Sequence, residues 1–146
     1  GTMDAFISVF NSEGVYLWAR TWGGNGSDRS YAVAVDNYGN AHVTGSFCSI
    51  VDFDPGPGED LHKSMNGDDV FLSKFNPAGE FIWARTWGGS SDDCGAGVAV
   101  DASDYTYITG RYKYLVDFNP NPGLDFHVSL GNRDIFLSRF PPDGNW

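Results

Sequence analysis

The chain has 146 residues, of which 41% are hydrophobic and 16% aromatic, enough apolar material for the core of one ordinary domain. Its net charge of −10 argues against binding to nucleic acid or to an anionic membrane, because both need clustered Lys and Arg. No stretch approaches the roughly 20 apolar residues of a membrane-spanning helix.

An internal repeat of 65 residues organises the chain. Residues 4–68 and 69–133 align without a gap and are identical at 29 of 65 positions, and a partial third copy occupies residues 134–146. The segment 18–24 recurs letter for letter as 83–89. Repeats of this length are typical of one supersecondary unit stacked on copies of itself. Residues 1–3 precede the repeats and are interpreted as a cloning remnant.

Each repeat predicts four short strands separated by turns rich in Gly, Asn and Asp. In chain order the predicted strands are residues 6–10, 15–22, 31–35, 41–47, 71–75, 80–87, 96–100, 106–112 and 136–140. Gly14 and Gly79 follow the first strand of each repeat, where a turn needs positive φ. The third strand of each repeat has small residues, which suits a crowded position where several sheets converge.

The strand pattern predicts an all-β protein. Alternation along residues 15–22 leaves both faces largely apolar, as in a sheet that is packed on both sides. Four antiparallel strands per repeat favour β-propeller blades, about two in this chain, over the alternative of a β-sandwich. Sandwiches rarely repeat internally at this level of identity.

The order of motifs also resembles a known family of repeats. Asp-x-Phe-x-Ser-x-Phe-Asn is followed by Trp-Ala-Arg-Thr-Trp-Gly-Gly, then by Val-Ala-Val-Asp and Thr-Gly. This series is similar to the bacterial β-propeller repeats of the SBBP type, with an acidic, proline-rich insert added at residues 49–67 and 114–132. The resemblance implies a secreted or cell-surface bacterial protein with a binding or scaffolding role, and it carries over no catalytic residue.

The predicted blades start and stop out of phase with the chain. Residues 31–87 supply one complete blade, whereas residues 6–22 and 96–140 supply complementary parts of another. Two blades are fewer than the four to eight of a propeller. The sequence therefore leaves two interpretations open: an excerpt of a longer propeller, or a homo-oligomer whose copies complete one ring. We favour assembly.

The two inserts contain the residues that most resemble a ligand site. Oxygen-bearing side chains recur at alternate positions of each insert, which is the donor type that calcium prefers. The candidate calcium ligands are Asp117, Asn119, Asn121 and Asp125 in the second insert and Asp52, Asp54 and Asp60 in the first. Turn-forming residues of a proline-rich loop explain the same composition without any metal. Phe53 and Phe118 are expected to staple the inserts to the blades.

Other repeated polar residues have simpler expected roles. His62 and His127 follow Asp60 and Asp125 and are expected to make a loop hydrogen bond, and His42 is expected to be a half-exposed strand residue. Asp28 and Asp93 are expected to cap backbone amides, and Arg20 and Arg85 to stack on tryptophans. Cys48 and Cys94 differ in repeat position, which favours free thiols over a repeated disulfide.

The sequence contains no phosphate loop, nucleophile elbow, zinc-protease motif or paired Cys-x-x-Cys, so we expect no enzymatic activity. The favoured function is a scaffold or interaction module that partners with itself and is stabilised by calcium. The alternative is a carbohydrate-binding module that uses exposed aromatic residues such as Tyr114, with a glycan or protein as ligand. A glycan-active enzyme ranks below both.

Overall fold

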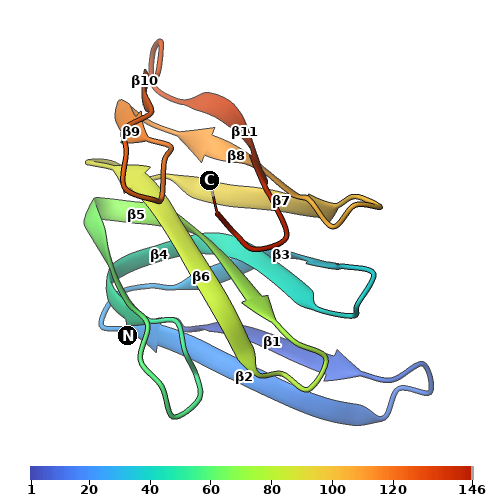
Figure 1. The fold of residues 1–146 in the computed structure, drawn as a ribbon. Coiled ribbons are helices and arrows are strands. Elements are labelled where there is room, and N and C mark those ends of the chain that lie inside the picture. The colour runs from blue at the N-terminus through green and yellow to red at the C-terminus, as the bar shows by residue number, and fades with distance from the viewer. Residues whose placement is uncertain (146) are drawn as a thin grey trace.

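The computed structural model describes residues 1–145 and shows an all-β protein (Figure 1). Within these residues there is no helix, so none that could cross a membrane. The strands are β1 (Ala5–Phe10), β2 (Tyr16–Gly24), β3 (Arg29–Val35), β4 (Ala41–Asp52), β5 (Leu61–Phe75), β6 (Phe81–Gly89), β7 (Cys94–Val100), β8 (Thr106–Tyr112), β9 (Leu115–Asp117), β10 (Phe126–Val128) and β11 (Asp134–Phe140). Every predicted strand is present, with bounds that differ by a few residues at most ends.

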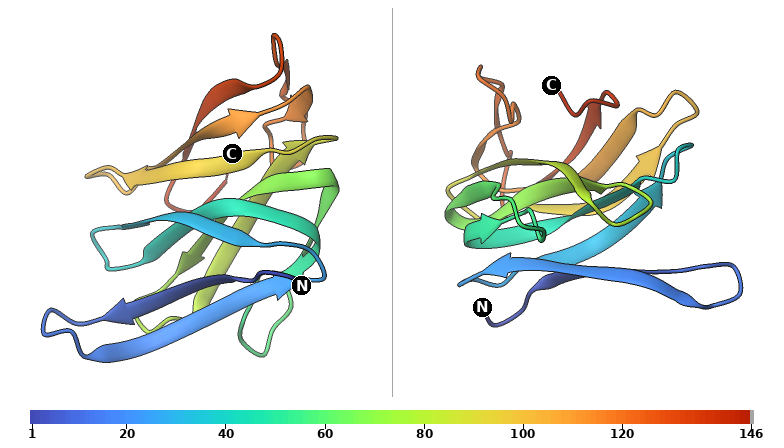
Figure 2. Two further views of the ribbon diagram at one scale, coloured as in Figure 1. Left: turned by 180° about the vertical axis from the view of Figure 1, so that it is seen from behind. Right: turned by 60° about the horizontal axis from the view of Figure 1, so that its bottom comes forward.

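The strands form three antiparallel units that stack in chain order (Figures 1 and 2). The N-terminal hairpin consists of β1 and β2. The central sheet has β3, β4, β5 and β6 paired in sequence order, which confirms the four-stranded sheet predicted for residues 31–87. The C-terminal sheet consists of β7, β8 and β11. The turns that follow β1 and β5 place Gly14 and Gly79 at φ 78° and 77°, as their sequence position predicted.

The inserts are β-hairpins, a feature that the sequence did not predict. In the first insert β4 and β5 continue their ladder beyond the four-stranded part of the central sheet, with Val51 opposite His62 and Asp52 opposite Leu61. In the second insert β9 pairs with β10. Each insert also touches the unit before it, because Gly24 pairs with Val51 and Gly89 pairs with Val116. The inserts therefore join neighbouring units through short backbone ladders.

Two apolar clusters fill the spaces between the three units, and they are copies of one another. The first lies between the N-terminal hairpin and the central sheet, and the second between the central and C-terminal sheets. Equivalent residues take equivalent places: Trp22 packs on Phe75 at 5.2 Å, and Trp87 packs on Phe140 at 5.2 Å. The repeat in the sequence is therefore a repeat of the interface as well as of the sheet.

The small-residue strands lie where the sheets come closest, as expected. A Cβ atom placed on Gly95 of β7 would fall 2.2 Å from the Thr44 hydroxyl of β4. Any larger side chain at Gly95 would have to push the two sheets apart. Phe53 and Phe118, the predicted staples, are buried in the two apolar clusters and fix the inserts to the sheets.

Candidate functional site

The predicted calcium ligands hold the insert loops through hydrogen bonds to backbone amides. Asp52 Oδ1 accepts from the N–H groups of Asp54 at 3.0 Å and Asp60 at 2.9 Å, and Asp54 Oδ1 accepts from Gly56 N–H at 2.7 Å. Hydrogen bonds of this kind close a turn-rich loop without a metal. The carboxylates therefore have a structural role already.

The second insert repeats this arrangement. Asp117 Oδ1 accepts from the N–H groups of Asn119 at 3.1 Å and Asp125 at 2.9 Å, and Asn119 Oδ1 accepts from Asn121 N–H at 2.9 Å. Across residues 1–145, no three His, Cys, Asp or Glu side chains are grouped so that they could hold a metal ion. Calcium binding, which would also draw on amide and backbone oxygens, stays a prediction.

The histidine of the first insert, His62, contacts the sheet. His62 Nδ1 is hydrogen-bonded to the Thr86 hydroxyl of β6 at 2.8 Å, its Nε2 lies 3.3 Å from Asp60 Oδ2, and its ring meets Phe53 edge-on. This geometry confirms the expected loop hydrogen bond. It also connects the insert to the fourth strand of the sheet, a contact that spans 24 residues and has no local signal in the sequence.

The histidine of the second insert has only part of this arrangement. His127 Nε2 lies 3.1 Å from Asp125 Oδ1 and the ring meets Phe118 edge-on, as in the first insert. No threonine hydroxyl reaches His127 from any of the described residues. The side chain of His127 is 56% exposed, compared with 23% for His62. Within residues 1–145 the C-terminal sheet consists of β7, β8 and β11, so no strand equivalent to β6 brings a threonine to His127.

A groove runs along β11. Its lining residues come from the second insert, β8 and β11: Tyr112, Phe118, Asp125, His127, Ile135, Phe136, Leu137 and Ser138. Ile135 and Leu137 are 86% and 72% exposed, whereas their counterparts in the central sheet, Val70 and Leu72, are 1% and 0% exposed. Val70 and Leu72 are covered by the C-terminal sheet in the second apolar cluster, whereas no further sheet among residues 1–145 packs on Ile135 and Leu137.

The opposite end of the molecule has the complementary open face. Phe6 and Phe10 of β1 are exposed, whereas their counterparts Phe71 and Phe75 in the central sheet are fully buried. The N-terminal hairpin therefore lacks a neighbour on the side where the central sheet has one. Contiguous apolar faces of this kind are unusual on an isolated soluble protein and mark interaction surfaces.

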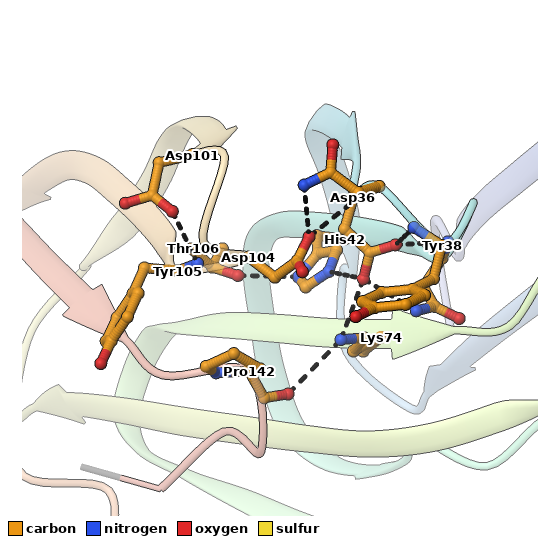
Figure 3. A network of polar contacts seen from close by, with 11 residues as sticks. Asp36, Tyr38, His42, Lys74, Asp101, Asp104, Tyr105, Thr106 and Pro142 are labelled. Atoms are coloured by element: carbon orange, nitrogen blue, oxygen red, sulfur yellow. Dashed lines mark hydrogen bonds and ion pairs between the residues drawn. The ribbon is translucent and has the colours of Figure 1, made fainter.

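A buried polar network joins the central and C-terminal sheets (Figure 3). His42 Nε2 lies 3.2 Å from Asp36 Oδ2, its Nδ1 is hydrogen-bonded to the Thr106 hydroxyl at 2.9 Å, and Lys74 Nζ lies 3.1 Å from the same Asp36 oxygen. Lys74 Nζ also donates to the Pro142 carbonyl at 3.4 Å. The network links strands from two repeats, and sequence reasoning missed it.

The prediction for His42 was wrong. Its side chain is fully buried rather than half-exposed, because Thr106 of the next repeat packs over it. Burial, and next the Lys74 ammonium, lower the pKa of His42, although Asp36 opposes them. Burial alone would raise the pKa of Asp36, but hydrogen bonds from Asn40, His42 and Lys74 outweigh burial and lower it. The network thus holds a neutral imidazole beside an ion pair.

A second group of carboxyls surrounds the turn after β6. Asp93 accepts from the N–H groups of Gly89 at 2.8 Å and Lys113 at 2.9 Å, and Asp28 caps Gly24 and Cys48 in the same way, as expected. Burial, with the nearby Asp92 carboxylate, raises the pKa of Asp93 to about 6. Asp93 is therefore a buried acceptor that loses its charge as the pH falls through about 6.

Asp69 is the most perturbed member of this group. Its Oδ2 accepts from Met65 N–H at 3.1 Å, while its Oδ1 is buried without a hydrogen-bond partner. Burial, and next the Asp93 and Asp68 carboxylates, raise the pKa of Asp69 to about 7. This carboxyl accepts a hydrogen bond within the local turn.

The remaining candidate residues pack or stack. Arg20 lies over Trp18 at 5.7 Å and Arg85 over Trp83 at 5.2 Å, which confirms the expected stacking. Both cysteines are free thiols in the structure. Tyr114, the aromatic residue proposed for sugar contact, is half-exposed, and the Lys113 ammonium lies 4.8 Å from its ring centre. A lysine over the ring leaves one face of Tyr114 at most for a sugar.

Comparison with known proteins finds no family model that matches this chain. The chain is similar to the regulatory protein FlaEY of Caulobacter vibrioides, at 26% identity over 145 residues, which are 99% of this chain and 15% of that protein. It is also similar to the uncharacterized WD repeat-containing protein L264 of Acanthamoeba polyphaga mimivirus, at 28% identity over 151 residues, covering 92% of this chain and 10% of that protein. Both relatives are far longer than the aligned region. The resemblance to SBBP repeats stays a prediction.

Proposed function

We propose that this chain is a non-enzymatic protein-interaction scaffold built of β-propeller blades. Three stacked antiparallel units, one of them with four strands, support a blade architecture. The similarity to a protein named for its WD repeats supports it independently, because such repeats form propeller blades. Propellers host many functions, and the scaffold role is argued here from the exposed faces.

The exposed ends of the stack are the observation that carries the proposal. One end presents Phe6 and Phe10, and the other presents Ile135 and Leu137. Inside the chain the same two kinds of face meet twice and bury one another in the two apolar clusters. The ends therefore fit one another head to tail, and copies of the chain stack into a closed ring when the rotation between them permits.

The absolute mass in solution tests this self-association. Light scattering behind a sizing column should give one sharp species near three or four chain masses. A monomer that persists at high protein concentration would contradict self-association. In that case the neighbouring blades would come from further repeats in one longer chain. Both relatives are much longer than the aligned region, as such a chain would be.

The proposal also includes a cellular location and a class of ligand. The resemblance to bacterial surface repeats supports a secreted or cell-surface location. A protein partner is favoured over a glycan, because Phe6 and Phe10 at one end and Ile135 and Leu137 at the other are exposed apolar side chains gathered on the two end faces. Glycan binding that is lost in Tyr114→Ala and survives chelation would instead favour the carbohydrate-binding alternative.

A further inference from the structure

A cavity of about 290 Å³ lies between the first insert, strand β2 and the turn that joins β5 to β6. Three charged and three apolar side chains line most of it: Arg20, Asp54 and Glu80, and Pro55, Pro57 and Phe81. This volume is near the lower end of the roughly 300–1,000 Å³ of small-molecule sites, so the cavity suits a ligand of a few heavy atoms.

Arg20 presents unused hydrogen-bond donors at this cavity. Its guanidinium lies over the Trp18 ring at 5.7 Å, and its Nη1 donates to the Ala19 carbonyl at 2.8 Å. No other residue among 1–145 accepts a hydrogen bond from Arg20 or forms an ion pair with it. A guanidinium has five N–H donors in a planar fork, so enough remain to hold a carboxylate through two parallel hydrogen bonds.

The equivalent arginine of the second repeat uses such a donor within the protein. Arg85 Nε donates to the Gly144 carbonyl at 2.7 Å. Gly144 corresponds to Gly79, which lies at the cavity, yet Arg20 makes no bond of this kind. The same arginine therefore holds a turn in one repeat and is available to a ligand in the other.

The two carboxylates at the cavity are each held by their own loop. Asp54 Oδ1 accepts from Gly56 N–H at 2.7 Å, and Glu80 Oε2 accepts from the Asn76 amide at 2.6 Å. Within residues 1–145 no ion pair joins Arg20 to either carboxylate. Charges of opposite sign thus line one cavity without neutralising one another by contact.

These carboxylates are particular to the first repeat. The second repeat has Asn119 and Asn145 at their positions, although residues 83–89 repeat residues 18–24 letter for letter. The shared fold of the two repeats therefore does not require the two charges.

The arrangement of charges selects the class of ligand. A ligand with only negative charge is repelled by Asp54 and Glu80, and one with only positive charge is repelled by Arg20. We propose that the cavity binds a small zwitterion, a free α-amino acid with an aliphatic side chain. Its carboxylate binds Arg20, its ammonium group lies beside the two carboxylates, and Phe81 and the two insert prolines cover its side chain. This site goes beyond the scaffold role and does not depend on self-association.

Three related ligands test the site on the unaltered chain. Leucine has both charges, leucine methyl ester lacks the carboxylate, and N-acetyl-leucine lacks the ammonium group. Each is titrated into the full chain while NMR follows the backbone amides of Gly56 and Gly79, which lie at the cavity. Leucine should give a saturable shift of both amides. The ester and the N-acetyl compound should each bind at least about tenfold more weakly, because each loses a charge-assisted contact. Equal binding of all three, or no saturable shift with leucine, would overturn the proposal.

Variants assign the two charges of the ligand to their partners. In Arg20→Gln the methyl ester should bind at least as well as leucine, and in Glu80→Gln the preference for leucine over N-acetyl-leucine should shrink. Arg20→Lys keeps the charge and should keep the preference for a free carboxylate.

The matched control is Arg85→Gln, which changes the equivalent arginine outside the cavity and should leave leucine binding unchanged. Urea unfolding shows that each variant is folded under the conditions of the titration. A preference for the free carboxylate that persists in folded Arg20→Gln would overturn the assignment. Equal loss of leucine binding in Arg85→Gln and Arg20→Gln would do the same, because the arginines would then act through the fold.

Discussion

Lys74 Nζ lies 3.1 Å from Asp36 Oδ2, and neither side chain has more than marginal contact with solvent. The pair sits between two repeats, with His42 and Thr106 completing its surroundings. Two buried charges are tolerated only when they are paired, because an unpaired buried charge is strongly destabilising.

Removing one member of this pair should destabilise the fold strongly. Asp36→Ala leaves the Lys74 ammonium buried without its counter-ion, and breaking such a pair costs about 3–5 kcal/mol of unfolding free energy. The double variant Asp36→Asn with Lys74→Met should cost less than Asp36→Ala alone. Urea unfolding at constant pH measures both. Equal costs for the single and double variants would contradict a role as a buried ion pair.

His42 should make stability depend on pH in the acidic range. Its pKa is lowered in the folded protein, chiefly by burial, while the unfolded chain takes up the proton near pH 6.5. The stability that His42 contributes is therefore complete above about pH 6.5 and is lost as the pH falls below it. The variant His42→Tyr has the residue of the second repeat, Tyr107, and cannot titrate there. Its unfolding free energy should fall less than that of the parent between pH 7 and pH 5.

Asp69 should make the protein less stable as the pH rises, which is opposite to the effect of His42. Burial raises its pKa to about 7 from 3.8, so ionisation is penalised in the folded state. The protein loses stability through Asp69 as the pH rises from about 4 to about 7, and Asp69→Asn removes that loss. The variant should be more stable than the parent at pH 8, on the order of 2 kcal/mol, with little difference at pH 4. An unchanged difference across this range would show that Asp69 titrates normally.

The insert carboxylates should stabilise their loops with or without calcium. Asp117 accepts two backbone hydrogen bonds, so Asp117→Ala should lower the unfolding free energy by about 2 kcal/mol even in excess chelator. If calcium binds, it should raise the melting temperature of the parent and leave that of the variant unchanged. Differential scanning fluorimetry with calcium and with chelator separates the two effects. No calcium shift in the parent would contradict the predicted calcium site.

The end faces should be required together for self-association. Glutamate in place of Leu137 or of Phe6 puts a charge into a face that is otherwise apolar, so either variant should reduce the solution mass to that of one chain. Tyr38→Glu is a matched control, because Tyr38 is also exposed but lies on a turn away from both faces. An oligomer that survives both face variants would place the contact elsewhere.

The strands could be predicted from sequence because their signals are local. Period-two alternation and a turn glycine such as Gly14 or Gly79 mark each strand within a few residues. The inserts were predicted wrongly. Their prolines and acidic residues suggested loops, but the first insert is a hairpin in which Val51 pairs with His62. Strand pairing of that kind depends on the register of the whole sheet.

The candidate sites were harder to predict for the same reason. His42 is buried by Thr106, which lies 64 residues away, and His62 meets Thr86 across the sheet. Neither contact is marked by a motif in the sequence. Comparison of the repeats offered one usable signal: Asp36 aligns with Asp101, and Lys74 aligns with Arg139 of the partial third copy, although Val9 occupies that position in the first repeat.

The short ladder between Gly24 and Val51 also affects how the chain folds during synthesis. The end of β2 cannot pair with β4 until the chain has emerged as far as residue 51, 27 residues later. At roughly 5–20 residues per second this wait lasts on the order of seconds, and it recurs at Gly89 and Val116. Each unit therefore completes its strand pairing only after the insert of the next unit has been synthesised. A ribosome that stalls inside an insert would leave the preceding unit with an unfinished edge.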